Sequence, residues 1–152
     1  ITGAILKKFL SGKNQPERMV LLVQKEVAER IVARDGKESI LSMSVKVYGK
    51  PRFIKKVPAR YFSPAPKVDS AIISIENISK NTFENSVDNE KRFFSIIKAG
   101  FAHKRKILMG NLETSFPSEG WKEKFEKCSI PEKVRAEDIE LKDWICLMKH
   151  EG

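Results

Sequence analysis

The sequence predicts an α/β first half followed by a small all-helical second half. Continuous or alternating apolar runs, which are typical of strands, occur before residue 79. Beyond it, apolar residues recur at the three-to-four-residue spacing of helices. The 152 residues, 41% of them hydrophobic, suffice for one core or for one core with a small satellite. We therefore divide the chain into an α/β unit (1–78), a linker (79–89) and a helical unit (90–152).

The α/β unit is expected to contain three helices and three strands. The helices, each with its apolar residues on one face, are predicted at 2–10, 25–34 and 40–48; the last of these segments could also be read as a strand. The strands are predicted at 19–23, 52–57 and 68–75. The first strand, Met19–Val23, is a continuous apolar run, which is typical of a strand buried on both faces. The second alternates, as a strand near a sheet edge does.

The linker is polar, and three helices are expected after it. The first runs from about Glu90 to Leu108 and is ended by Gly110-Asn111. A short second helix covers Trp121–Phe125, and the third spans Ala136–Met148 with five apolar residues on one face.

The predicted sheet looks unfinished. A strand of the Met19–Val23 kind needs partners on both edges, and a helix such as 2–10 before it normally crosses over from an earlier strand. The sequence contains no Gly-x-Gly, so no phosphate- or nucleoside-binding turn is predicted. We therefore expect the back part of a doubly wound sheet whose front part is missing.

The basic residues are segregated along the chain. Residues 39–68 contain seven basic side chains and no acid, and residues 91–112 contain six and no acid. These two windows hold 13 of the 29 basic residues, so the rest of a chain of net charge +9 is slightly acidic. This pattern favours a surface that binds a polyanion, nucleic acid first. The alternative interpretation is a pair of solvated basic faces.

Cysteine and histidine usage favours neither disulfides nor metal. Cys128 and Cys146 make no disulfide framework, a reduced cytoplasmic interior is the default, and Cys146 is interpreted as a small buried hydrophobe in an apolar run. His103 and His150 are far apart, so no metal site is predicted. No signal peptide is recognised at the start, and the longest apolar stretch is too short to span a membrane.

Four stretches together resemble one known family. They are MVLLVQKEVAERIV at 19–32, YFSPAPKVDSAIISI at 61–75, GFAHKRKILMGNL at 100–112 and VRAEDI at 134–139. In this order and spacing they resemble the KsgA-like small-subunit ribosomal RNA adenine dimethyltransferases, and more distantly the Erm-type adenine methyltransferases. The most specific stretch is Phe-x-Pro-x-Pro-Lys-Val-Asp-Ser before an apolar strand, and Arg-Ala-Glu near the end favours the KsgA-like branch.

The resemblance implies a longer parent enzyme. In this family a Rossmann-like core that binds S-adenosyl-L-methionine comes first, and a later Asn-(Leu/Ile)-Pro-Tyr motif is followed by Ile-(Ser/Thr), where this chain reads Ile1-Thr2. The chain is then the C-terminal portion, inactive alone and without the donor-binding residues. The implied parent is a cytoplasmic, monomeric rRNA adenine N6-dimethyltransferase that acts in ribosome biogenesis on the immature small subunit, with no metal and no membrane.

The resemblance also assigns a base-holding loop. Phe62 is expected to stack on the extruded target adenine, and Pro64 and Pro66 are expected to fix the loop, with Tyr61 left as packing. Without the resemblance, a core aromatic capped by a proline turn is the simpler interpretation. Lys67 is a candidate phosphate contact. The alternative is that Asp69, two residues away, neutralises its charge.

A second group of residues is expected to contact the RNA backbone. The stretch FAHKRKIL resembles the family's Phe-x-x-Arg-Arg-Lys-x-Leu, with Lys104 at a position where arginine is usual. Lysine keeps the charge but loses the bidentate fork, so the assignment covers Lys104, Arg105 and Lys106. Seven-residue spacing predicts Lys91, Lys98 and Arg105 on one helix face, which either tracks phosphates or is solvated. Gln24-Lys25-Glu26 matches the family without a role that we can name.

Two other function classes stay open at this point. One is a stand-alone RNA- or ribosome-binding module without catalysis. The other is a DNA-binding domain built on the C-terminal helices, although the basic residues avoid the last helix and no helix-turn-helix register is convincing.

Overall fold

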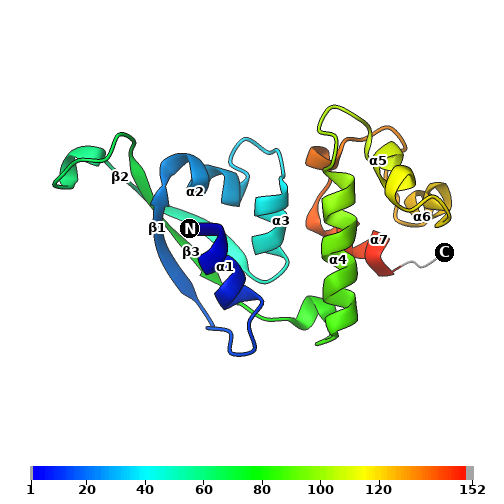
Figure 1. Ribbon diagram of the computed structural model, residues 1–152, viewed down its shortest axis with the longest axis horizontal. Coiled ribbons are helices and arrows are strands. Elements are labelled where there is room, and N and C mark those ends of the chain that lie inside the picture. Colours follow the sequence, from blue (N-terminus) through cyan, green and yellow to red (C-terminus); the bar gives the residue numbers. More distant parts are fainter. Residues whose placement is uncertain (1, 150–152) are drawn as a thin grey trace.

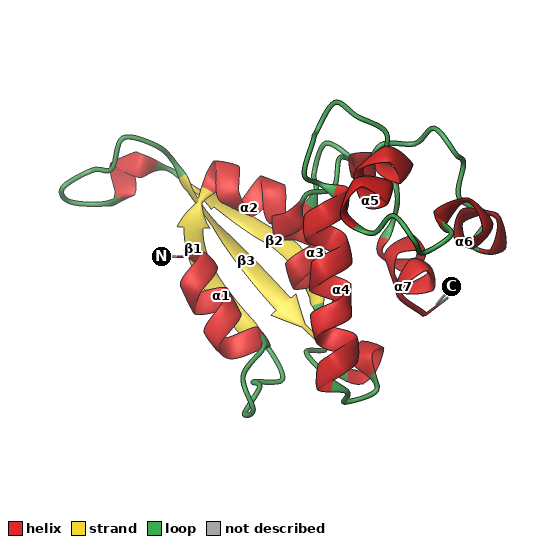
Figure 2. Cartoon of the chain, turned by 45° about the vertical axis from the view of Figure 1, so that its right-hand side comes forward, coloured by secondary structure: helices red, strands yellow, loops and turns green. Residues whose placement is uncertain are grey.

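The computed structural model describes residues 2–149, so Ile1 and His150 lie outside the described residues. A three-stranded antiparallel sheet stands at one end and a group of helices at the other (Figure 1). The strands are β1 (Met19–Gln24), β2 (Lys50–Val57) and β3 (Ser70–Glu76), in the order β1-β3-β2. Helices α1 (Thr2–Leu10), α2 (Lys25–Val32) and α3 (Ile40–Lys46) lie along one face of the sheet (Figure 2).

The remaining helices form the second half of the molecule. They are α4 (Val87–Gly100), α5 (Leu108–Ser115), α6 (Trp121–Lys127) and α7 (Leu141–Lys149), with short 3-10 turns at Ala59–Tyr61, Asn81–Phe83 and Ala136–Asp138. The core of this half is aromatic, and Trp121, Trp144 and Phe125 are each at most 2% exposed. The predicted order of an α/β half followed by a helical half is therefore confirmed.

The prediction that Met19–Val23 is buried on both faces is wrong. In the antiparallel register Leu21 pairs with Ile73 beneath the helices, whereas Val20 and Leu22 point to the opposite face. Val20 is 61% exposed and Leu22 is 53% exposed, because no described element covers that face. Ile54 of β2 is exposed as well. An apolar run without alternation shows that both faces suit an apolar neighbour, not that both have one.

The single helix predicted from Glu90 to Leu108 is also wrong. Helix α4 ends at Gly100, and Gly110-Asn111 lies inside α5 instead of ending a helix. The side-chain amide of Asn111, which is 3% exposed, donates hydrogen bonds to the carbonyl oxygens of Gly100 (2.9 Å) and His103 (3.1 Å). These bonds satisfy carbonyls that a continued helix would otherwise use, so the chain turns away at Phe101.

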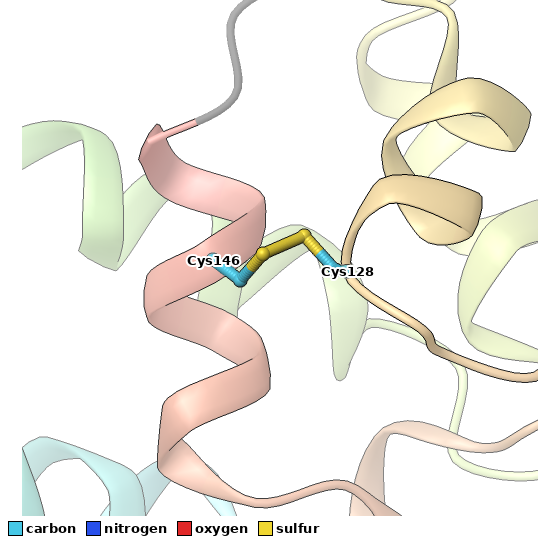
Figure 3. Close-up of a disulfide and its surroundings, with 2 residues drawn as sticks. All are labelled: Cys128 and Cys146. Carbon is cyan, nitrogen blue, oxygen red and sulfur yellow. A yellow bond between two sulfur atoms is a disulfide. The ribbon is translucent and has the colours of Figure 1, made fainter.

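Two further expectations for the second half are corrected. The segment predicted as one helix at Ala136–Met148 is a 3-10 turn followed by α7, and the Asp143 carboxylate accepts a hydrogen bond from the Glu140 N–H at 3.0 Å between them. Cys128 and Cys146 form a disulfide that joins the end of α6 to α7 (Figure 3). Counting two cysteines gave no reason to pair them, but the fold places their Cα atoms 5.9 Å apart.

Candidate functional site

The loop between β2 and β3 carries the expected base-holding residues. It projects beyond the sheet, away from the helical half (Figures 1 and 2). Phe62 is half-buried directly after the 3-10 turn, whereas Pro64, Pro66 and Lys67 are exposed, and the Ser63–Pro64 peptide bond is cis. Tyr61 is 68% exposed with the Arg60 guanidinium 5.1 Å from its ring centroid, so its interpretation as packing is wrong.

Asp69 ties the two ends of this loop together. Its Oδ1 accepts a hydrogen bond from the Ala59 N–H at 2.8 Å, and its carbonyl oxygen accepts one from the Lys25 N–H at 2.9 Å. Its Oδ2 lies 3.4 Å from the Lys56 ammonium, so the structure pairs Asp69 with Lys56 and not with Lys67. The Ala59 N–H, with Lys56 beside it, lowers the pKa of Asp69 below its ordinary value.

Protonation of Asp69 is expected to loosen the loop. Because its pKa is lowered in the folded loop, the closed loop is stabilised above the ordinary pKa and loses that contribution as the pH falls through the lowered one. We expect hydrogen exchange at the Ala59 amide, corrected for its intrinsic pH dependence, to quicken over this acid range. In Asp69→Asn it should already be about fivefold faster near neutral pH. Asp35→Asn, which alters a different turn, is the control, and an unchanged Ala59 amide in Asp69→Asn would contradict the assignment.

The second group of expected site residues lies on the loop between α4 and α5. Lys104, Arg105 and Lys106 are exposed, and the ends of the loop are fixed. The Phe101 ring stacks on Trp144 with centroids 5.3 Å apart, and the Leu108 N–H donates to the Val134 carbonyl at 2.8 Å. A loop of exposed cations held at both ends presents a positioned charge cluster to a polyanion.

The expected basic helix face is not formed. Lys91 and Lys98 lie on α4, but Arg105 lies beyond the end of that helix. Lys98 lines an open groove between α1, α3 and α4, whereas Lys104 lines an adjoining cavity of about 580 Å³ between α2 and the helical half. The loop of residues 58–69 and the loop of residues 101–107 lie on different parts of the surface (Figure 1), so the predicted residues that they carry are not brought together.

Comparison with known proteins shows which family this chain belongs to. A model of the family described as "Ribosomal RNA adenine dimethylase" matches residues 1–150. The chain belongs to this family. Its relatives include a protein of Fusobacterium nucleatum named "Ribosomal RNA small subunit methyltransferase A", 38% identical over 98% of this chain and 57% of the relative. A protein of the same name from Nostoc sp. is 37% identical over 97% of the chain and 56% of the relative. The chain therefore spans little more than half the length of these relatives.

Solved structures support the fold of this dimethylase-family chain. It is similar to a dimethyladenosine transferase from Plasmodium falciparum, with a TM-score of 0.76 and 22% identity over 97% of this chain and 61% of the other. The 23S rRNA methyltransferase ErmE gives a TM-score of 0.73 at 21% identity over 98% of this chain and 60% of the other. The chain therefore shares its α/β fold with these two structures.

The residues that the structure describes do not fit a site for the methyl donor. After β1 the chain enters α2 directly at Lys25, with no glycine-rich turn that a nucleoside could approach. Gly49, before β2, is packed closely against Ile75, Glu76 and Ile78, which leaves no room for a nucleoside beside it. Among residues 2–149, no cluster of three potential ligands could hold a metal ion, and no helix is long and apolar enough to span a membrane.

Sequence reasoning missed two positioning residues. Asp69 was considered only as a neighbour of Lys67, and Asn111 only as a helix breaker. A signal existed in both cases, since Asp and Asn near loop ends commonly bind free backbone groups. Their partners, however, are 8 to 11 residues away for each bond that matters, which local sequence patterns do not reveal.

Proposed function

We propose that this chain is the C-terminal, base-holding and RNA-docking portion of an S-adenosyl-L-methionine-dependent small-subunit rRNA adenine N6-dimethyltransferase. The observation that carries the proposal is the family match over residues 1–150 together with relatives named as small-subunit rRNA methyltransferases. In this proposal, residues 1–78 complete a Rossmann-like domain, residues 79–89 form a linker, and residues 90–152 form the small helical domain whose basic loop docks the RNA. The parent enzyme is a monomer that acts in the cytoplasm on the immature small subunit.

The uncovered face of the sheet supports the proposal that a further part of the enzyme packs against the α/β half. Val20 and Leu22 are more than half exposed on the face opposite the helices, and Ile54 at the register shift of β2 is 48% exposed. Among the described residues β1 pairs with β3 alone, so its other edge is open. Exposed apolar faces and open edges are usually covered in the complete domain. We assign the donor-binding half to this face, because relatives are nearly twice as long as the chain.

The loop that carries Phe62 is suited to hold an extruded base. Methylation of adenine N6 requires the base to leave its stack and to be held flat while the methyl group arrives in line. A half-buried Phe62 between the anchored end at Ala59 and the two prolines offers a ring that is already placed. Lys67 stands exposed on the same loop, and we assign it to a phosphate beside the flipped nucleotide.

The exposed basic loop is proposed to contact the rRNA backbone, and charge reversal tests it. Arg105→Glu/Lys106→Glu should weaken binding of small-subunit rRNA about tenfold and lower the slope of log K against log salt by about two. Fluorescence anisotropy across a salt series measures both quantities. Lys122→Glu/Lys127→Glu on α6 is the matched control, with the same charge change away from the loop.

Two comparisons separate this function from its alternatives. Duplex DNA at matched salt should bind more weakly than structured RNA, and equal binding would favour the DNA-binding interpretation. The 152-residue chain should transfer no methyl group to immature small subunits, whereas a protein that also contains the donor-binding half should do so. Failure of that longer protein to methylate would leave a stand-alone RNA-binding module.

A further inference from the structure

A groove between α1, α3 and α4 is not accounted for by the two loops. It has a volume of about 920 Å³, within the roughly 300–1,000 Å³ of ordinary ligand pockets. Its floor is apolar, formed by Leu41 and Val45 of α3 together with Phe94 of α4. Sequence analysis would assign these residues to the core, yet the groove between them is open.

An aromatic platform forms part of this floor. The Phe94 ring, which is partly exposed, stacks on Tyr48 with centroids 6.1 Å apart and an interplanar angle of 27°. The Tyr48 hydroxyl donates a hydrogen bond to the Glu90 carboxylate at 2.5 Å, and the Tyr48 ring meets Phe83 edge-on at 5.6 Å. These contacts fix the ring pair, so the Phe94 side chain that lines the groove need not be ordered when a ligand arrives.

Cations surround the platform on three elements. Lys7 of α1, Arg30 of α2, and Lys91 and Lys98 of α4 line the groove, and all four are exposed. Among the described residues that line it, the one carboxylate is Glu90, which already binds Tyr48 and lies 3.7 Å from the Lys80 ammonium. The rim is therefore positive, and the groove is complementary to an anionic ligand with an apolar, flat part.

We propose that this groove binds an unpaired stretch of RNA, with one base over Phe94 and the flanking phosphates along Lys7, Lys91 and Lys98. Unpaired bases bind proteins by stacking on aromatic rings while a cationic groove follows the backbone. The groove adjoins the cavity that Lys104 of the basic loop lines, because Arg30, Ile40 and Leu41 line both. The identification of this RNA as ribosomal rests on the proposed function. The preference of the groove for an unpaired nucleic acid is argued from its own residues.

The first test reverses charge at the rim. A labelled single-stranded RNA of about 12 nucleotides is titrated with the 152-residue chain at about 50 to 200 mM salt. Lys7→Glu/Lys91→Glu should weaken binding about tenfold and lower the salt slope by about two. The control Lys122→Glu/Lys127→Glu on α6 changes the net charge equally. Its effects on the affinity and on the salt slope should be clearly smaller, because only the long-range effect of net charge remains. Equal effects of the two double variants would overturn the proposal.

The second test fills the groove without changing its charge. Ser95 lines the groove and is exposed, so Ser95→Phe should weaken RNA binding about fivefold through the lost base contact. Binding of inorganic polyphosphate, which has no bases, should stay unchanged, as should RNA binding by Thr114→Phe on α5. If polyphosphate binding falls equally, or if RNA binding does not fall, no base enters the groove. An acidic amphipathic peptide that binds there in place of RNA would point to a protein partner and overturn the proposal.

The two proposals fail in different ways. If Arg105→Glu/Lys106→Glu weakens RNA binding and Lys7→Glu/Lys91→Glu does not, the proposed function stands and the groove proposal is wrong. If the groove variant alone acts, the basic loop is not the docking site. A chain that binds no RNA at all contradicts both.

Discussion

Gly100→Ala is expected to destabilise the protein by about 2 kcal/mol, although alanine is the better helix former. Gly100 is the last residue of α4, and a Cβ there would lie 2.5 Å from Trp144 Cη2 and 2.8 Å from Leu108 Cδ1. Trp144 is fully buried and stacked on Phe101, so its ring has no free space to move into. Overpacking of about 3 kcal/mol thus outweighs about 1 kcal/mol gained in helix propensity.

Thermal and urea unfolding measure this effect, and the chain supplies a matched control. Gly110 lies within α5, where a Cβ would meet its nearest neighbour, Ile107 Cγ1, at an ordinary 3.7 Å. Gly110→Ala should therefore stabilise the protein by about 0.5–1 kcal/mol. The two glycine-to-alanine changes are expected to shift the free energy of unfolding in opposite directions. Stabilisation by both changes would show that Trp144 can move aside.

The clash also bears on function, because it reaches the basic loop. Phe101, the first residue after α4, stacks on the same Trp144 ring, and Asn111 binds the carbonyls of Gly100 and His103. Displacing Trp144 would loosen the end of the loop that carries Arg105. Gly100→Ala should then weaken RNA binding without any change in charge, and hence with the salt slope retained.

Periodicity predicted the elements whose contacts are local. Helix α1 was predicted with its observed ends, Thr2–Leu10, and the strand before α2 was predicted within one residue. The division of the 90–115 region was not predictable in this way. Apolar spacing continues from Phe93 to Leu108, and what ends α4 is the buried amide of Asn111 and the ring of Trp144. The contact between Gly100 and Trp144 joins residues more than 40 positions apart, so the spacing of apolar residues along the sequence does not reveal it.

The candidate site was predicted to a similar extent. The family resemblance pointed to Phe62 and to the basic loop, and the structure places the two groups apart. The groove over Phe94 was not predicted, because an aromatic at helical spacing looks like core whether or not a neighbouring helix covers it. The exposure of Val20 and Leu22 escaped prediction for the same reason: sequence gives the polarity of a face, and packing decides what covers it.

Phe62→Ala is expected to cause the largest loss of function. If its ring stacks on the target adenine, removing the ring forfeits about 1–3 kcal/mol, which is about 5- to 150-fold in kcat/KM for rRNA. The assay needs the chain together with the donor-binding half of the enzyme, and immature small subunits as substrate. Phe62→Trp should keep most of the activity, because any flat aromatic face supports stacking.

Tyr61 makes this prediction decisive, because it is the neighbouring ring on the same loop. It is 68% exposed and has the Arg60 guanidinium over its face, whereas Phe62 is half-buried. Tyr61→Ala should lower kcat/KM no more than about threefold if its ring merely contacts solvent and Arg60. A 2-aminopurine in place of the target adenine reports stacking directly, since its fluorescence should be quenched with Phe62 present and restored in Phe62→Ala. Loss of quenching in Tyr61→Ala instead would transfer the stacking role to Tyr61, and quenching that survives both changes would mean that this loop does not hold the base.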